Sequence, residues 1–138
     1  ETSLKVAETI IKKASILKRF TFVAGDLFKV SLGLETDTVL YSNILHIYSE
    51  TENSRLFKKI HTSLKPGGRL ILVDLFLKDN RTEPFNAALF SLTMLMFTAT
   101  GRTYTFKETE KLLKMNGFGI FKRCELGQGS SVIEATKI

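Results

Sequence analysis

The 138-residue sequence predicts an α/β fold, a three-layer sandwich whose central sheet is mainly parallel. Two observations lead to this prediction. Short β-rich segments alternate with segments whose apolar residues recur at helical spacing, which is the pattern of parallel strands joined by helices. The last two β-rich segments, 118–126 and 131–136, are separated only by the turn 127–130, so they predict an antiparallel hairpin that closes the sheet.

Four segments have the periodicity of helices. Residues 3–17 place apolar side chains on one face and lysines on the other, as in an amphipathic helix. Segments 50–65 and 106–116 each begin at the Ser/Thr-x-x-Glu spacing of a capping box. Residues 85–98 are apolar nearly all round, and we expect them to form a helix that is covered by the rest of the fold.

The other apolar segments predict the parallel strands. Residues 20–24 and 37–42 are short runs of β-branched, aromatic and apolar residues. Residues 69–77 form a nearly continuous apolar run, which is typical of a central strand buried on both faces. Asp74 interrupts this run and is a costly residue there, because a buried carboxylate needs a partner.

Composition bounds the class of protein. The length fits one compact domain, and Cys124 is the single cysteine, so the sequence favours the cytoplasm and predicts no disulfide framework and no metal site. The net charge of +6 would permit a nucleic-acid partner, but the basic residues form no visible cluster, so we expect none. The uncharged segment 85–100 is shorter than the roughly 20 apolar residues of a membrane span, so we expect no membrane partner.

Polar residues stand where the predicted parallel strands end, which is the edge at which open α/β sheets bind ligands. Asp26 follows the first strand, Ser42 and His46 follow the second, and Asp74 lies near the end of the third. Structural interpretations stay open: Asp26 as a turn former or helix cap, and His46 as a hydrogen-bonded histidine between apolar neighbours. The Gly-Gln-Gly at 127–129 opens no helix, so it predicts a hairpin turn and not a phosphate site.

Four stretches together resemble the class I S-adenosylmethionine-dependent methyltransferases, and among these the small-molecule O-methyltransferases of the plant caffeate and hydroxyindole type. They are Val-Ala-Gly-Asp-Leu-Phe at 23–28, Leu-Tyr-Ser-Asn-Ile-Leu-His at 40–46, the Leu-Lys-Pro-Gly-Gly stretch and strand at 64–74, and Asn-Gly-Phe at 116–118. The resemblance covers nearly the whole chain. It implies a Rossmann-like sheet with an antiparallel closing hairpin, an enzyme that transfers methyl groups, and S-adenosyl-L-methionine as its cofactor.

The resemblance also implies roles for individual residues in cofactor binding. Asp26 takes the place of the acid that bonds the exocyclic amine of the adenine, and Leu27 takes that of the residue that closes over the ring. Ser42 matches a residue that contacts the cofactor.

For the chemistry, the resemblance implies that His46 is the general base that deprotonates the acceptor hydroxyl and that Asp74 orients it. Imidazole suits this task, because its ordinary pKa of about 6.5 leaves it mostly neutral at pH 7 and able to accept a proton. Met94 and Thr98 fall on positions that line the pocket of a small, aromatic acceptor.

Two departures from the family pattern keep an alternative function open. Ile47 stands where the family has an acid after the histidine, and Thr103 stands where it has a second carboxylate. A threonine cannot supply the charge that would stabilise an imidazolium. The alternative is a non-catalytic methyltransferase-like module used for ligand binding or assembly. A Rossmann dehydrogenase is disfavoured by the closing hairpin and by the spacing of Asp26 and His46.

Parts that the resemblance implies are missing from residues 1–138. The family's acid-x-Gly-x-Gly-x-Gly loop is nowhere in the sequence, and of the family sheet order 3-2-1-4-5-7-6 only strands 3 to 7 are represented. A sheet with that gap would leave strand edges unpaired. We therefore expect residues 1–138 to be the C-terminal portion of a methyltransferase catalytic domain, whose full-length protein forms a homodimer through an N-terminal domain.

Overall fold

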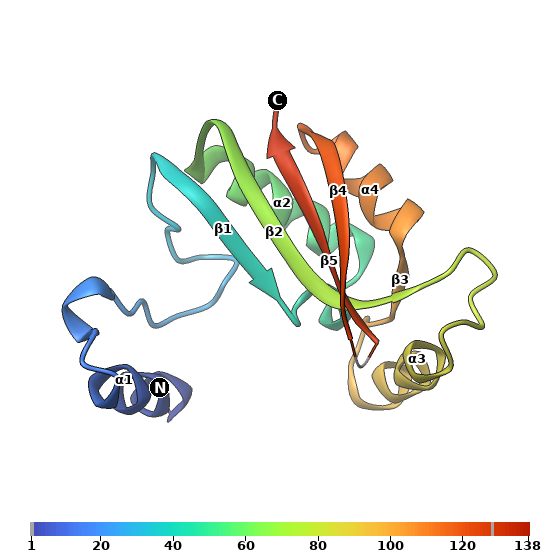
Figure 1. Ribbon diagram of the computed structural model, residues 1–138, viewed down its shortest axis with the longest axis horizontal. Helices are drawn as coiled ribbons and strands as arrows, with labels where there is room; N and C mark the ends of the chain where they lie inside the picture. Colours follow the sequence, from blue (N-terminus) through green and yellow to red (C-terminus); the bar gives the residue numbers. More distant parts are fainter. Residues whose placement is uncertain (1, 128) are drawn as a thin grey trace. The chain divides into compact units, whose positions relative to one another are not determined.

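The computed structural model describes residues 2–127 and 129–138, shown as a ribbon in Figure 1. These residues form two compact units, one ending at Ser31 and one spanning Leu32–Ile138. The sheet and three of the four α-helices belong to the second unit.

The first unit contains helix α1 (Thr2–Lys13) and a 3₁₀ turn, Leu17–Arg19. The helix predicted over 3–17 therefore ends early, because Ser15 adopts a left-handed φ of 59° that a helix cannot continue. The strand predicted over 20–24 is wrong, since those residues have no regular structure. A strand forms only beside a hydrogen-bonded neighbour, and no described residue pairs with this segment.

The second unit is built on a sheet with the strand order β1-β2-β5-β4, which is visible in Figure 1. The strands span Thr36–Ser42 (β1), Leu64–Leu77 (β2), Ser130–Lys137 (β5) and Phe118–Gly127 (β4). β1 runs parallel to β2, whereas β5 is antiparallel to both β2 and β4. The α/β class and the antiparallel closing hairpin are thus confirmed. The two residues of β3 (Tyr104–Thr105) add a parallel pairing at the end of β2.

Helices α2 (Glu50–Ser63) and α4 (Phe106–Met115) lie on the same side of the sheet in Figure 1. Both predicted capping boxes are present, at Ser49 with Glu52 and at Thr105 with Glu108. The core lies between these helices and the sheet, and along β2 every second residue from Leu70 to Phe76 is buried.

Helix α3 (Phe85–Phe97) follows β2, as predicted, but it is not covered. Among its described side chains only Ala87 is buried, whereas Phe85 and Phe97 are 78% and 77% exposed. The expectation of a covered helix was wrong because α3 has its main contacts with β2 alone, so most of its apolar surface meets no other element of this unit. Within the described part of the chain, α3 and the other helices all fall short of the length and apolarity that crossing a membrane requires.

Candidate active site

A histidine and an aspartate meet at the carboxyl end of β2. His46 lies in the short 3₁₀ helix Leu45–Ile47 that follows β1, and Asp74 lies near the end of β2. The Nδ1 atom of His46 is 2.7 Å from Oδ1 of Asp74, and the backbone N–H of His46 donates to Oδ2 at 3.4 Å. Asp74 is only 1% exposed, so this pairing gives the buried carboxylate the partner that it needs.

The pairing determines which nitrogen of His46 can accept a proton. A carboxylate oxygen only accepts hydrogen bonds, so Nδ1 carries the hydrogen in the neutral ring and Nε2 keeps its lone pair. The N–H of Leu75 also donates to Oδ1 of Asp74, at 2.8 Å, and this bond fixes the carboxylate. The arrangement presents one oriented basic nitrogen and places a negative charge beside any imidazolium that forms.

Helix α3 also contacts the His46 ring. Phe90 packs edge-to-face against His46, with ring centroids 4.8 Å apart and planes at 85°. His46 as a whole is 8% exposed. Its ring therefore contacts both a carboxylate from β2 and an aromatic ring from α3, the next element along the chain.

A buried amide holds the backbone on both sides of His46. Asn53 of α2 is fully buried, and its Nδ2 donates to the carbonyl oxygens of Leu45 and Tyr48, each at 2.9 Å. Its Oδ1 accepts a hydrogen bond from the Tyr41 hydroxyl at 2.8 Å. Two peptide carbonyls that flank the histidine are thereby satisfied inside the fold.

Two buried tyrosines complete this support. The Tyr104 hydroxyl donates to the Tyr48 carbonyl at 2.7 Å, and its oxygen lies 3.4 Å from Asn53 Nδ2. Burial raises the pKa of Tyr41 and the pKa of Tyr104 above the ordinary value of a phenol. Both hydroxyls therefore remain protonated donors at neutral pH, and the segment that carries His46 stays tied to α2 and β3.

The turn that follows α3 lies against the His46 segment. The Thr98 hydroxyl donates to the Met94 carbonyl at 2.7 Å and accepts from the Gly101 N–H at 2.8 Å. A Cβ atom on Gly101 would collide with the His46 carbonyl oxygen and with Thr98 Oγ1, so only glycine fits there. The structure thus brings Thr98 and Gly101, which follow α3, next to the backbone of His46, whereas Met94 is half-buried within α3.

Thr103 is 1% exposed, and its hydroxyl oxygen has no hydrogen-bond partner among the described residues. Its backbone N–H reaches Ser91 Oγ only at 3.5 Å. Thr103 stands where the resemblance implies a second carboxylate. In this fold that position is buried and carries no charge.

Replacing Thr103 by valine is expected to stabilise the protein by about 1 kcal/mol, since valine has the same shape and removes a buried hydroxyl without a partner. Urea unfolding of the full-length protein would measure the change in the free energy of unfolding. Thr109→Val is the matched control, because the buried Thr109 hydroxyl donates to the Thr105 carbonyl at 3.0 Å and its loss should destabilise. A destabilisation of equal size in both variants would contradict the expectation for Thr103.

In the first unit, Asp26 lies in a tight turn after Gly25. Its Oδ1 accepts a hydrogen bond from the Phe28 N–H at 2.9 Å, which is the turn-forming contact that the sequence also predicts. The Asp26 side chain is nonetheless 46% exposed, with Lys29 Nζ at 3.6 Å from Oδ2. Leu27 follows in the same turn and is half-buried.

In the second unit, Ser42 ends β1 and pairs in register with Val73, the residue before Asp74. The Ser42 hydroxyl oxygen accepts a hydrogen bond from Asn43 Nδ2 at 3.2 Å. The polar groups of Ser42 and Asp74 therefore lie at the same edge of the sheet, as the ends of parallel strands do.

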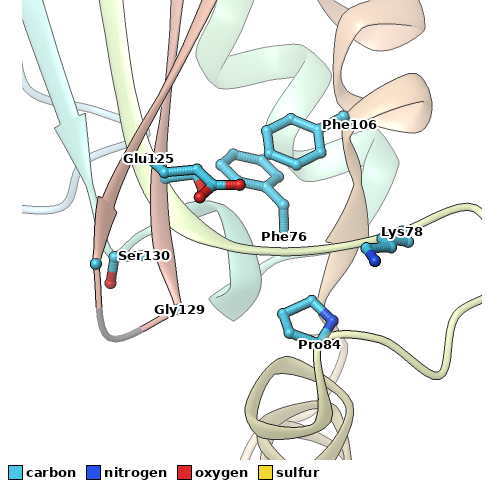
Figure 2. Close-up of a pocket in the computed structure, with 9 residues that line it drawn as sticks. Phe76, Lys78, Pro84, Phe106, Glu125, Gly129 and Ser130 are labelled. Atoms are coloured by element: carbon cyan, nitrogen blue, oxygen red, sulfur yellow. The ribbon is translucent and has the colours of Figure 1, made fainter.

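A cavity of about 200 Å³ lies at the β4–β5 hairpin and the end of β2 and is drawn in Figure 2. Its lining includes the stacked rings of Phe76 and Phe106, the side chains of Lys78 and Glu125, and Ser131, the residue opposite Asp74 in the sheet. None of the predicted site residues lines it. The cavity is thus separate from the His46 site.

Comparison with known proteins identifies the family of this chain. The family described as O-methyltransferase domain matches residues 3–119. The chain belongs to this family. Acetylserotonin O-methyltransferase of Gallus gallus is 35% identical to this O-methyltransferase domain over 101 residues, which cover 73% of the chain and 29% of that protein. The chain spans about a third of the length of the curated relatives that it matches.

Solved structures have the same fold as this O-methyltransferase domain. An O-methyltransferase family 2 protein from Planctomyces limnophilus, solved in complex with apigenin, has a TM-score of 0.91 and 27% identity. The match covers 98% of this chain and 40% of that one. Human N-acetylserotonin methyltransferase, solved in complex with S-adenosylmethionine, has a TM-score of 0.77 and 28% identity over 90% of this chain and 37% of its own. These matches confirm the Rossmann-like methyltransferase fold.

The residues that support His46 were not predicted from the sequence, although a signal for one of them exists. Asn53 falls on the helical face defined by Leu56, Phe57 and Ile60, so it is a polar residue in an apolar stripe and must be buried with partners. Tyr41 and Tyr104 carry no comparable signal, because aromatic residues in strands are ordinary core residues.

Proposed function

We propose that residues 1–138 are the C-terminal portion of the catalytic domain of an S-adenosylmethionine-dependent O-methyltransferase. In this proposal the full-length protein methylates a hydroxyl group of a small, aromatic acceptor, with His46 as the general base. The observation that carries it is the 2.7 Å contact between His46 Nδ1 and Asp74, which leaves Nε2 as the basic nitrogen.

The proposed chemistry begins with a proton transfer. The acceptor hydroxyl gives its proton to His46 Nε2, and the positive charge that forms on the ring is balanced by Asp74 at Nδ1. The acceptor oxygen, now an oxyanion, attacks the methyl carbon as the carbon–sulfur bond breaks. Because this is an in-line displacement, we expect the positioning of the two reactants to contribute much of the rate.

S-adenosylmethionine, when bound, supplies an electrophilic methyl group on a sulfonium. In this chain the groups that fit it are the half-exposed Asp26 carboxylate and Leu27 for the adenine, and the Ser42 hydroxyl at the edge of the sheet. These groups suit such contacts chemically. A carboxylate oxygen can accept a hydrogen bond from the exocyclic amine of adenine, and a serine hydroxyl can donate one to the cofactor. We propose that a glycine-rich loop outside residues 1–138 holds the methionine part.

An aromatic acceptor is proposed from the surroundings of the His46 ring. Phe90 and Met94 of α3 supply an aromatic face and a polarisable, conformationally adaptable side chain on one side of the site. Apigenin, the ligand of the Planctomyces structure, is therefore a suitable first probe. We also propose that the full-length protein acts as a cytoplasmic homodimer, which light scattering and fractionation would test.

The test uses the full-length protein. Calorimetry with S-adenosylhomocysteine should detect one cofactor site, and incubation with methyl-labelled cofactor and a panel of phenols that includes apigenin should label an acceptor. Absence of cofactor binding would overturn the proposal.

A second candidate function is a non-catalytic methyltransferase-like module. The burial of Thr103 without a charged partner and the half-exposed Ile47 after His46 favour it, since neither side chain can stabilise an imidazolium. Cofactor binding without methylation of any acceptor in the panel would favour this module over the enzyme.

Asp74→Asn is expected to lower kcat about 10²- to 10⁴-fold, because an amide can donate to His46 Nδ1 and so turn the ring to the wrong tautomer. The measurement is steady-state methyl transfer with the full-length variant. Glu134→Gln is the control, since Glu134 of the neighbouring strand β5 pairs with Arg69 and Lys122 on the surface. Equal activity of Asp74→Asn and wild type would contradict the role of Asp74.

A further inference from the structure

Arg102 joins three segments that surround the candidate site. It lies in the loop between α3 and β3, and its Nη2 bonds a carboxylate oxygen of Glu50 and lies 3.2 Å from Oε1 of Glu108. Its guanidinium lies over the Tyr104 ring, with Cζ 4.5 Å from the centroid. Glu50 begins α2 and Glu108 is in the first turn of α4, so one side chain connects the loop to the start of two helices.

Hydrogen bonds other than the one from Arg102 also hold the carboxylate of Glu108 in place. One oxygen accepts the Thr105 N–H at 2.8 Å in the capping box, and the other accepts Arg81 Nη2 at 2.6 Å. Burial alone would raise the pKa of Glu108, but the Thr105 N–H and the two guanidinium groups lower it overall. Glu108 therefore presents a permanent, oriented charge to Arg102 at neutral pH.

A second contact, besides that of Arg102, connects the same loop to the start of α2. The Thr100 hydroxyl donates to Oε2 of Glu52 at 2.7 Å, and this oxygen also accepts the Ser49 N–H at 2.9 Å. Gly101 lies between Thr100 and Arg102 in the sequence and packs closely against the His46 carbonyl oxygen. The loop thus touches the segment that carries His46 at Gly101, and Arg102 and Thr100 bind it to the start of α2, the next helix along the chain.

The contacts of this loop affect the position of helix α3. This helix is exposed over most of its surface, and Phe90, its contact with the His46 ring, lies within the three turns that precede the loop. With few buried contacts of its own, α3 depends on its ends for its position.

We propose that Arg102 is a positioning residue for the His46 site, because it ties the segment 98–105 to Glu50 and Glu108 and so holds α3, with Phe90, against the His46 ring. The effect on catalysis rests on the proposed O-methyltransferase function. Loss of Arg102 should loosen the acceptor side of the site, so it should raise KM for the acceptor about fivefold while cofactor binding stays unchanged. Lysine keeps the charge but lacks the planar fork and the stacking surface, so Arg102→Lys should lie between wild type and Arg102→Ala.

The experiment compares Arg102→Ala, Arg102→Lys and Glu50→Gln in the full-length protein by hydrogen–deuterium exchange and by acceptor kinetics. Arg123→Ala is the matched control, because Arg123 pairs with a carboxylate, Glu110 at 2.7 Å, and lies over a ring, Phe106 at 4.7 Å, and neither partner belongs to residues 98–105. We expect amide exchange in residues 98–105 to rise about tenfold in Arg102→Ala and less in Arg102→Lys and Glu50→Gln, with Arg123→Ala like wild type.

Unchanged exchange in 98–105, or an equal rise in Arg123→Ala, would overturn the proposal, whether or not the protein transfers methyl groups. Faster exchange with an unchanged KM would overturn the link between this loop and the acceptor. A wild-type protein that methylates no acceptor would instead count against the proposed function, and the exchange result would still decide the structural role of Arg102.

Discussion

His46→Ala is expected to lower kcat for methyl transfer by about 10²- to 10⁴-fold, which is the usual contribution of a positioned general base. Alanine removes the only nitrogen that the Asp74 contact leaves free to accept a proton, while the backbone N–H that bonds Asp74 remains. Binding of S-adenosylhomocysteine should be retained, because His46 is assigned to the acceptor and not to the cofactor. Single-turnover kinetics and calorimetry on the full-length protein measure the two quantities separately.

His61→Ala serves as the control for this experiment. His61 is the other histidine of the chain, lies on α2 and packs edge-to-face against Phe118 at a centroid distance of 5.4 Å. It should reduce stability and leave kcat of the folded protein unchanged. If His46→Ala kept wild-type activity across the phenol panel, the assignment of His46 as base would be wrong and the non-catalytic module would gain support.

Asn53→Ala is expected to destabilise the fold by about 2 to 5 kcal/mol, since a buried hydrogen bond contributes about 0.5 to 1.5 kcal/mol and a buried polar group left without a partner costs about 1 to 3 kcal/mol. The substitution removes one hydrogen bond from each of the carbonyl oxygens of Leu45 and Tyr48, and it leaves the buried Tyr41 hydroxyl without its acceptor. That is a large fraction of the roughly 5 to 15 kcal/mol that stabilises a typical domain. Urea unfolding followed by circular dichroism would measure the loss.

The control is Thr51→Ala, an exposed position in the first turn of the same helix. A change within about 0.5 kcal/mol is expected there, as for most surface substitutions. A similarly small effect of Asn53→Ala would mean that water replaces the amide and that the buried network does not hold the His46 segment.

Much of the second unit could be predicted because its signals are local. Capping boxes mark the start of α2 and α4, and the continuous apolar run marks β2. The strand predicted over 20–24 failed for the opposite reason, since a strand depends on a neighbour that its own residues do not encode. The prediction that α3 is covered was wrong for a similar reason. The apolar residues of a helix indicate which surface it could bury, but not whether another element packs against that surface.

The candidate site was only partly predictable. The Asp74 carboxylate inside an apolar strand and His46 beyond the preceding strand could be identified as unusual, and the structure brings them to 2.7 Å. Phe90 and Arg102 could not be identified, because an aromatic residue in an apolar helix and an arginine in a polar loop are ordinary there. Their contacts with His46 and Glu50 arise from chain segments far apart in sequence.

The alternation of β2 makes the His46 pair sensitive to the length of the strand as well as to its residues. Asp74 shares one face with Leu70, Leu72 and Phe76, so inserting or deleting one residue just before it would turn the carboxylate to the opposite face of the sheet. Many apolar substitutions could be accommodated along this strand. A change of one residue in its length could not, because it would separate acid from imidazole and bury an unpaired charge at once.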